Sequence, residues 1–243
     1  SPHCINVMEI RPMDNSANRL LDGELEEQSY LSMKIDNLLI FFSIIMPEMT
    51  KIEEQMLDET LVKTYGDFGI TNDNRTLWDP DHPGRFKRMP ILGDLYKNLR
   101  DNPKADRLAI VLNRFVGGSA KAFNHQTNVD LSNPYTVIDL SYLKKKLLSA
   151  GMFIATDLIW DLAKQNRLKQ KAIVIDEVWQ LIGSNSSPQA AEYLVEMAKI
   201  GRAYNTSIIF ATQDINDFFS LENGKYGKAI LAISKTKIIL NLE

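Results

Sequence analysis

Two short apolar runs near the end of the chain, each followed at once by polar side chains, leave few folds open. Residues 172–175 are apolar and lead into Asp176 and Glu177, and residues 207–211 lead into Thr212 and Gln213. Between them lies a helical pattern that starts at Ser187-Pro188, an N-cap followed by a first-turn proline. A strand, a helix and a second strand in this order predict two parallel strands joined by a crossover helix.

The surrounding sequence extends this pattern. Residues 143–167 and 226–234 have the spacing of helices, and residues 136–140 and 237–240 have the composition of buried strands. Strands that alternate with helices predict an α/β fold with a mostly parallel sheet, covered by helices on both faces.

The first half of the chain has a different texture. Apolar residues recur at helical spacing in four segments, residues 29–46, 50–66, 91–100 and 104–115. Thr50 with Glu53 three residues later is typical of a capping box. The segment from Gly69 to Gly84 is rich in Asn, Asp, Pro and Gly, which predicts a polar loop.

Composition excludes several kinds of protein. The 243 residues carry 28 Lys and Arg against 31 Asp and Glu, and a net charge of −3 lacks the footprint of a dedicated nucleic-acid binder. Cys4 is the single cysteine, which rules out an intrachain disulfide and fits a reducing compartment. The apolar run at residues 38–46 is shorter than the ~20 residues of a membrane span. Both ends of the chain suggest a fragment of a longer protein.

Asp176 and Glu177 are the first candidate site residues. Ligands of a parallel sheet bind beyond the carboxyl ends of its strands, where two carboxylates are costly unless they handle a cation or a proton. In P-loop NTPases the first acid holds the Mg²⁺ shell, and an adjacent Glu can act as general base on the attacking water. The alternative is a helix N-terminus, where acidic side chains are favoured by the macrodipole.

Gln213 and Arg202 are the other two candidates. A Gln at a neighbouring strand end can orient water or sense hydrolysis beside a γ-phosphate, although a polar residue at a strand end is common. Arg202 lies near the end of the helix between the strands. It is either a cation favoured at a helix C-terminus or an arginine finger that reaches the phosphate of a neighbouring subunit.

A phosphate-binding loop is missing from the sequence. Such a loop needs the pattern G-x-x-x-x-G-K-[ST], in which backbone amides and a lysine cradle the phosphates. Gly224-Lys225 is followed by Tyr226, and Gly227-Lys228 is followed by Ala229. Either the ATPase interpretation is wrong, or the phosphate-binding segment precedes Ser1.

Several segments together resemble the C-terminal ATPase domain of the VirB/TraC-type conjugative transfer ATPases, which energise type IV secretion. The segments are IVIDEVWQL, EMAKIGRAYN, IIFATQDINDF and KTKIIL. The opening SPHCINVMEI resembles the part of that domain after its second core strand. GGSAKAFNHQTNVDLSNPYTVIDLSYL resembles the link from a helical insertion back into the core. The resemblance is strongest from about Gly117 onward.

The resemblance implies a RecA-like P-loop NTPase core, truncated at its N-terminus, with an all-helical insertion. Residues 1–17 and 126–243 would form the partial core, and residues 18–125 the insertion. Asp176 and Glu177 would be the Walker B pair, with Asp176 holding Mg²⁺ through water and Glu177 as the base. Gln213 would be the strand-end sensor, and Arg202 a finger acting in trans.

The resemblance also implies a cellular setting. The parent protein would bind ATP and Mg²⁺ between the subunits of a homo-hexamer in the cytoplasm, at the inner face of the cell membrane, beside inner-membrane components of a secretion channel. Without Walker A, the fragment itself is expected to hold no nucleotide or metal and to be inactive.

Two other functions remain open on the sequence. A DNA-translocating motor of the coupling-protein or HerA/FtsK kind shares the same core, although the net charge of −3 weakly disfavours a DNA channel. A non-catalytic RecA-like scaffold would account for the missing phosphate-binding loop.

Overall fold

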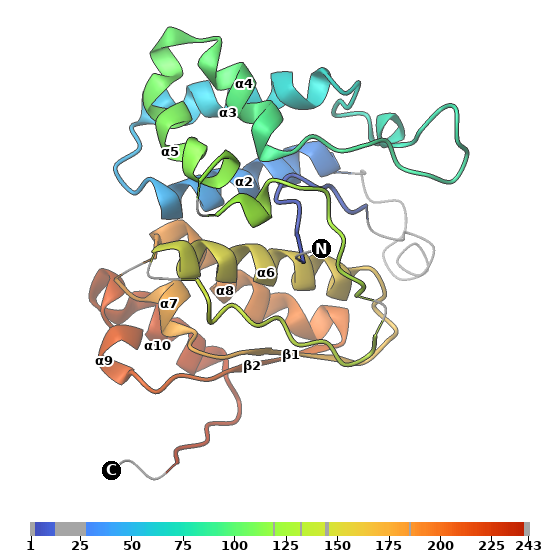
Figure 1. Ribbon diagram of the computed structural model, residues 1–243. Coiled ribbons are helices and arrows are strands. Elements are labelled where there is room, and N and C mark those ends of the chain that lie inside the picture. Colours follow the sequence, from blue (N-terminus) through green and yellow to red (C-terminus); the bar gives the residue numbers. More distant parts are fainter. Residues whose placement is uncertain are drawn as a thin grey trace. The chain divides into compact units, whose positions relative to one another are not determined.

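The chain forms two compact units in a computed structural model that describes residues 3–12, 28–118, 120–131, 133–143, 146–184 and 186–240. Residues 3–12 and 28–139 belong to a helical unit, and residues 140–240 belong to an α/β unit (Figure 1). None of the helices in these ranges is long and apolar enough to span a bilayer.

The four helices predicted in the first half are confirmed. The helical unit contains α2 (Tyr30–Ile45), α3 (Lys51–Gly66), α4 (Leu92–Arg100) and α5 (Asp106–Val116), with short 3-10 turns η1 (Asn74–Leu77), η2 (Pro103–Ala105) and η3 (Lys121–Phe123). Ser29 caps α2 by accepting a hydrogen bond from the Ser32 N–H. Thr50 and Glu53 form the predicted capping box of α3.

Aromatic side chains fill the core of the helical unit. Phe41 packs edge-on against Phe42, at 5.5 Å between ring centroids, and against Phe115, at 5.3 Å. Residues of all four helices are fully buried around them, among them Leu38, Leu57, Leu61, Leu95, Leu99 and Leu112. Burial of such side chains contributes ~1.5–3 kcal/mol each, and this packing stabilises helices that would be marginal in isolation.

The segment at residues 3–12 packs within the helical unit. The hydroxyl of Tyr65, a fully buried residue of α3, donates to the Met8 carbonyl at 2.6 Å. Asn6 Nδ2 donates to the Pro90 carbonyl at 2.9 Å. Two reciprocal hydrogen bonds join Cys4 to Asn128: the Cys4 N–H donates to the Asn128 side chain at 2.7 Å, and the Asn128 N–H donates to the Cys4 carbonyl at 3.2 Å.

These contacts bear on the predicted domain limits. The two stretches assigned to the α/β core on either side of the insertion, residues 3–12 and 126–128, do lie side by side. Both stretches also hydrogen-bond to the segment before α4, through Asn6 to Pro90 and Gln126 to Met89, and the compact units divide after Asp139. The predicted limits of core and insertion stay a prediction. The predicted limit between residues 17 and 18 lies outside the described residues.

The α/β unit contains the strand–helix–strand element predicted from the sequence. Its elements are α6 (Lys146–Lys164), β1 (Lys171–Ile175), α7 (Trp179–Ile182), α8 (Pro188–Ile200), η4 (Gly201–Tyr204), β2 (Thr206–Phe210), α9 (Ile215–Phe218), η5 (Leu221–Gly224) and α10 (Lys225–Ile233). The Ser187 hydroxyl caps α8 by accepting from the Ala190 N–H at 3.1 Å. Tyr193 of α8 donates to Asp157 of α6 at 3.1 Å.

The two strands pair in parallel, as predicted. Lys171 is opposite Thr206, and Ile175 is opposite Phe210. Helices α6 and α8 lie on the same side of the pair (Figure 1). Ile173 and Ile175 of β1 are buried. On the other face Val174 is 64% exposed and Ile209 is 50% exposed. The expectation of a sheet covered on both faces is therefore wrong for the residues described.

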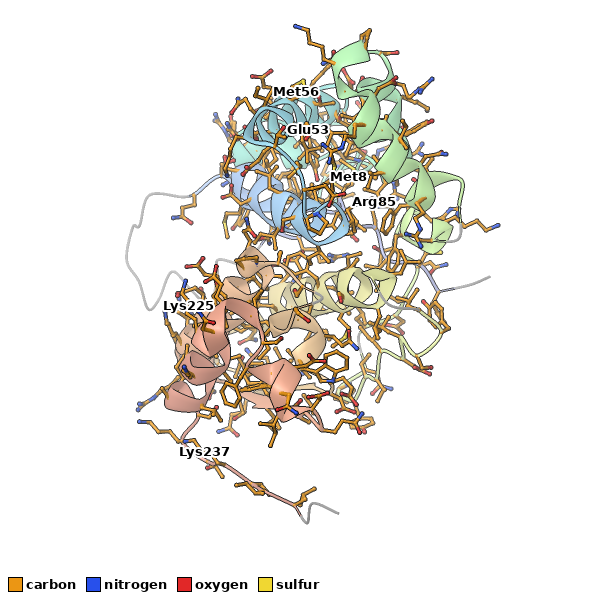
Figure 2. The ribbon with its side chains drawn as sticks, turned by 90° about the vertical axis from the view of Figure 1, so that its left-hand side faces the viewer. Met8, Glu53, Met56, Arg85, Lys225 and Lys237 are labelled. Atoms are coloured by element: carbon orange, nitrogen blue, oxygen red, sulfur yellow. The ribbon has the colours of Figure 1, made fainter. Side chains whose placement is uncertain are left out.

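Two predicted strands are also absent from the described structure. Residues 136–140 and 237–240 have no strand assignment. Val137 is 71% exposed, and Ile239 is 84% exposed on a segment that leads away from α10 past Lys237 (Figure 2). A strand is stable only where a neighbour takes its backbone hydrogen bonds, and the described sheet contains β1 and β2 alone. Apolar composition alone was therefore not enough to make residues 136–140 and 237–240 form strands.

The contact between Tyr65 and Met8 gives a first prediction. Tyr65→Phe removes the donor and leaves a buried carbonyl without it, so we expect the free energy of unfolding to fall by about 1–2 kcal/mol. Urea unfolding followed by circular dichroism measures this. Tyr135→Phe, at a side chain that is 81% exposed, is the matched control. Equal stability of the two variants would show that Tyr65 does not anchor the N-terminal segment.

The capping box of α3 gives a second prediction, about pH. The Thr50 N–H donates to Glu53 at 2.8 Å and is the main cause that lowers the pKa of Glu53; the Thr50 hydroxyl and Arg107 act in the same direction, against partial burial. A carboxyl whose pKa is lower in the folded state stabilises the fold above its unfolded pKa, and this stability is lost as the pH falls through the folded pKa. Glu53→Gln keeps an acceptor oxygen but cannot titrate.

We therefore expect Glu53→Gln to lose less stability than the unchanged protein when the pH is lowered from neutral to below the ordinary Glu value of 4.5. Urea unfolding at the two pH values measures the difference. Glu59→Gln, on an exposed position of the same helix, removes the same charge and tests for a general charge effect. An acid response identical to that of the unchanged protein would argue against the capping role.

Candidate active site

The carboxyl ends of the two strands are joined beyond the strands themselves. The Ala211 N–H donates to the Ile175 carbonyl at 2.9 Å, and the Val178 N–H donates to the Ala211 carbonyl at 3.0 Å. Val178 is fully buried, which anchors the turn that follows β1. Because the backbone is fixed on both sides, the polar residues after each strand are held at one edge of the sheet.

Glu177 lies at the centre of this edge. The Gln213 amide donates to Glu177 Oε1 at 2.5 Å, and the indole N–H of Trp179 donates to Glu177 Oε2. Glu177, predicted as the base, and Gln213, predicted as the strand-end sensor, are therefore in contact, and their roles stay predictions. Glu177 is half-buried, whereas Gln213 is exposed.

The backbone at Glu177 has an unusual conformation. Its φ is +50°, in the left-handed region that residues other than Gly, Asn and Asp seldom adopt. The Glu177 N–H donates to Asp176 Oδ1 at 2.9 Å, and the Glu177 carbonyl accepts from the Gln180 N–H at 2.9 Å. Such strain costs ~1–3 kcal/mol and persists only where the surroundings over-determine it, as they do in functional sites.

Asp176 is more exposed than Glu177 and is suited to a different role. It is exposed at the end of β1, and its one described hydrogen bond is the contact from the Glu177 N–H. A carboxylate with this access can accept from water or hold a hydrated cation, because oxygen ligands suit Mg²⁺. In the described part of the chain no cluster of three or more His, Cys, Asp or Glu side chains could hold a metal ion by itself.

Helices α7 and α9 lie close together beside this edge. A Cβ on Gly183, just after α7, would lie 2.6 Å from the Trp179 carbonyl oxygen and 2.9 Å from the Asp217 carbonyl oxygen. Ser220 Oγ accepts from the Ser184 N–H at 2.9 Å and donates to the Asp217 carbonyl at 2.8 Å. The absence of a side chain at Gly183 therefore lets the segments after β1 and after β2 approach each other.

Arg202 is not brought to this edge within the chain. It lies in η4, which precedes β2, so it is at the amino end of the strand and Gln213 follows the carboxyl end. Five residues of strand separate the two edges, a rise of roughly 16 Å. Arg202 is exposed and its role in trans stays a prediction. Trp179 is the site residue that the sequence analysis missed, because a Trp at the start of a helix usually packs into a core.

Comparison with known proteins shows what the chain is similar to. Residues 126–236 match the AAA-like domain family. The structure is similar to that of VirB4 of Thermoanaerobacter pseudethanolicus, with a TM-score of 0.77 and 26% sequence identity. The chain resembles a type IV secretion ATPase. This confirms the family resemblance predicted from the sequence. A search of curated proteins finds no match.

The likeness to VirB4 extends over both compact units. It covers 93% of this chain but only 58% of the VirB4 chain. The helical unit is therefore part of the shared architecture, although the AAA-like match begins only at residue 126. At the coarse level, the α/β expectation is confirmed as a helix-rich α/β structure with a small parallel sheet.

The close approach at Gly183 gives a third prediction. Gly183→Ala forces its methyl group against two backbone carbonyls that cannot rotate away, so we expect a loss of about 1–3 kcal/mol of stability. Gly66→Ala is the matched control, because a Cβ there meets nothing within 4 Å. Chemical denaturation followed by tryptophan fluorescence compares them. If Gly183→Ala were as stable as Gly66→Ala, the packing of α7 against α9 would not be tight.

Proposed function

We propose that this chain is part of an ATPase that powers type IV secretion, with a RecA-like P-loop core. The AAA-like match and the likeness to VirB4 support the ATPase family. The observation that carries the catalytic proposal is the contact between Glu177 and Gln213, which joins two strand ends at the sheet edge where ligands bind.

The residues at this edge suit the hydrolysis of ATP by water. Glu177 would accept a proton from water as the water oxygen attacks the γ-phosphorus and the bond to the bridging oxygen of ADP breaks. Gln213, bound to the same carboxylate, would orient that water. Asp176 would hold the hydration shell of Mg²⁺ through its exposed carboxylate. The bound ion would neutralise charge on the phosphate oxygens.

The remaining parts of the site would come from outside this chain. A G-x-x-x-x-G-K-[ST] segment in the longer protein would hold the phosphates. Arg202, which lies away from Glu177, would serve a neighbouring subunit of a homo-hexamer. Such an assembly would work in the cytoplasm at the inner face of the membrane, against inner-membrane components of a secretion or conjugation channel that transfers DNA.

Catalysis by Glu177 gives a fourth prediction. In the longer protein, with a phosphate-binding segment ahead of Ser1, Glu177→Gln should lower ATP turnover by about 10²–10⁴-fold, because the amide cannot accept the proton. Phosphate release measures the rate. Glu192→Gln, on an exposed position of α8, is the matched control. Retained turnover in Glu177→Gln would exclude Glu177 as the base.

A further inference from the structure

Trp179 makes a contact with Glu177 that the proposed reaction does not yet use. We propose that Trp179 is a positioning residue: its indole N–H, together with the Gln213 amide, holds the Glu177 carboxylate in one orientation. This inference rests on the proposed function, in which Glu177 is the base.

The two donors bind different oxygens from different elements. The Trp179 indole binds Oε2 and comes from the first residue of α7, whereas Gln213 binds Oε1 and follows β2. A carboxylate held on both oxygens cannot rotate about its terminal bond without breaking a hydrogen bond. Each oxygen has a further lone pair, so the carboxylate can still accept a proton from water.

Trp179 is itself fixed in place. Its carbonyl accepts from the Gly183 N–H at 2.7 Å, and it is flanked by Val178, which is fully buried. Further along α7, Leu181 and Ile182 are also buried. The indole is half-buried, so its N–H would lose a partner if it turned away from Glu177. The backbone that carries the indole is therefore held by α7 and by the buried residues around it.

The backbone conformation of Glu177 explains why its carboxylate needs two donors to hold it. A residue at φ +50° directs its side chain differently from a strand residue, and a glutamate has several rotatable bonds beyond that point. A base must lie within hydrogen-bond reach of the proton it accepts, and misplacement by about 1 Å can cost 10²-fold in rate. Two donors on fixed elements remove that freedom before the substrate binds.

The contact can be tested without nucleotide, by NMR of the indole N–H groups in the 243-residue chain. The three signals belong to Trp78, Trp160 and Trp179, and loss of one signal in Trp179→Phe assigns it. We expect Glu177→Ala to shift the Trp179 signal upfield and to speed its hydrogen exchange, while the Trp78 and Trp160 signals stay in place. An unchanged Trp179 signal in Glu177→Ala overturns the proposal.

The consequence for catalysis is tested in the longer protein. Trp179→Phe keeps an aromatic ring but removes the donor, so we expect kcat to fall about tenfold to a hundredfold with KM for ATP unchanged. Trp78→Phe, in the helical unit, is the matched control. Full turnover in Trp179→Phe, where Glu177→Gln has lost it, overturns the positioning role alone. Full turnover in Glu177→Gln instead overturns the proposed base, whatever the indole signals show.

Discussion

The α/β unit depends on the parallel pairing of β1 with β2. Strands that run in the same direction cannot be joined by a tight turn, so the chain has to return along a helix, here α8. That connection requires both strands to end at the same edge, and the backbone hydrogen bonds of Ala211 and Val178 extend the pairing past the strand ends. The meeting of Glu177 with Gln213, 36 residues apart, follows from this pairing.

Features with a local physical cause could be predicted from the sequence. The caps of α3 and α8 need only a Ser or Thr at the right spacing from the first turn, and the structure contains both. The strand–helix–strand element followed from two apolar runs with a helical pattern between them. The contact of Trp179 with Glu177 could not be predicted, because it depends on the left-handed backbone of Glu177. No neighbouring Gly or Asn indicates such a conformation.

Features that depend on distant partners were mispredicted. Residues 136–140 and 237–240 have the composition of strands, but composition does not supply the neighbour that a strand needs. The same holds for the exposed face with Val174 and Ile209, since a covering layer has to come from elsewhere. The contacts of the N-terminal segment, for which no partner was predicted, also depend on distant residues, since Tyr65 and Asn128 are at least 57 residues away.

At Glu177, the residue type that would make the turn most stable differs from the residue type that the proposed chemistry needs. Glycine adopts this conformation without steric cost, so it is the residue of lowest conformational energy for the turn. Glycine could, however, neither bind Gln213 through a side chain nor accept a proton. A chain optimised for stability alone would place Gly there and lose the carboxylate. In the proposed function, the turn after β1 is thus a point at which this protein gives up some stability of its fold to keep a carboxylate.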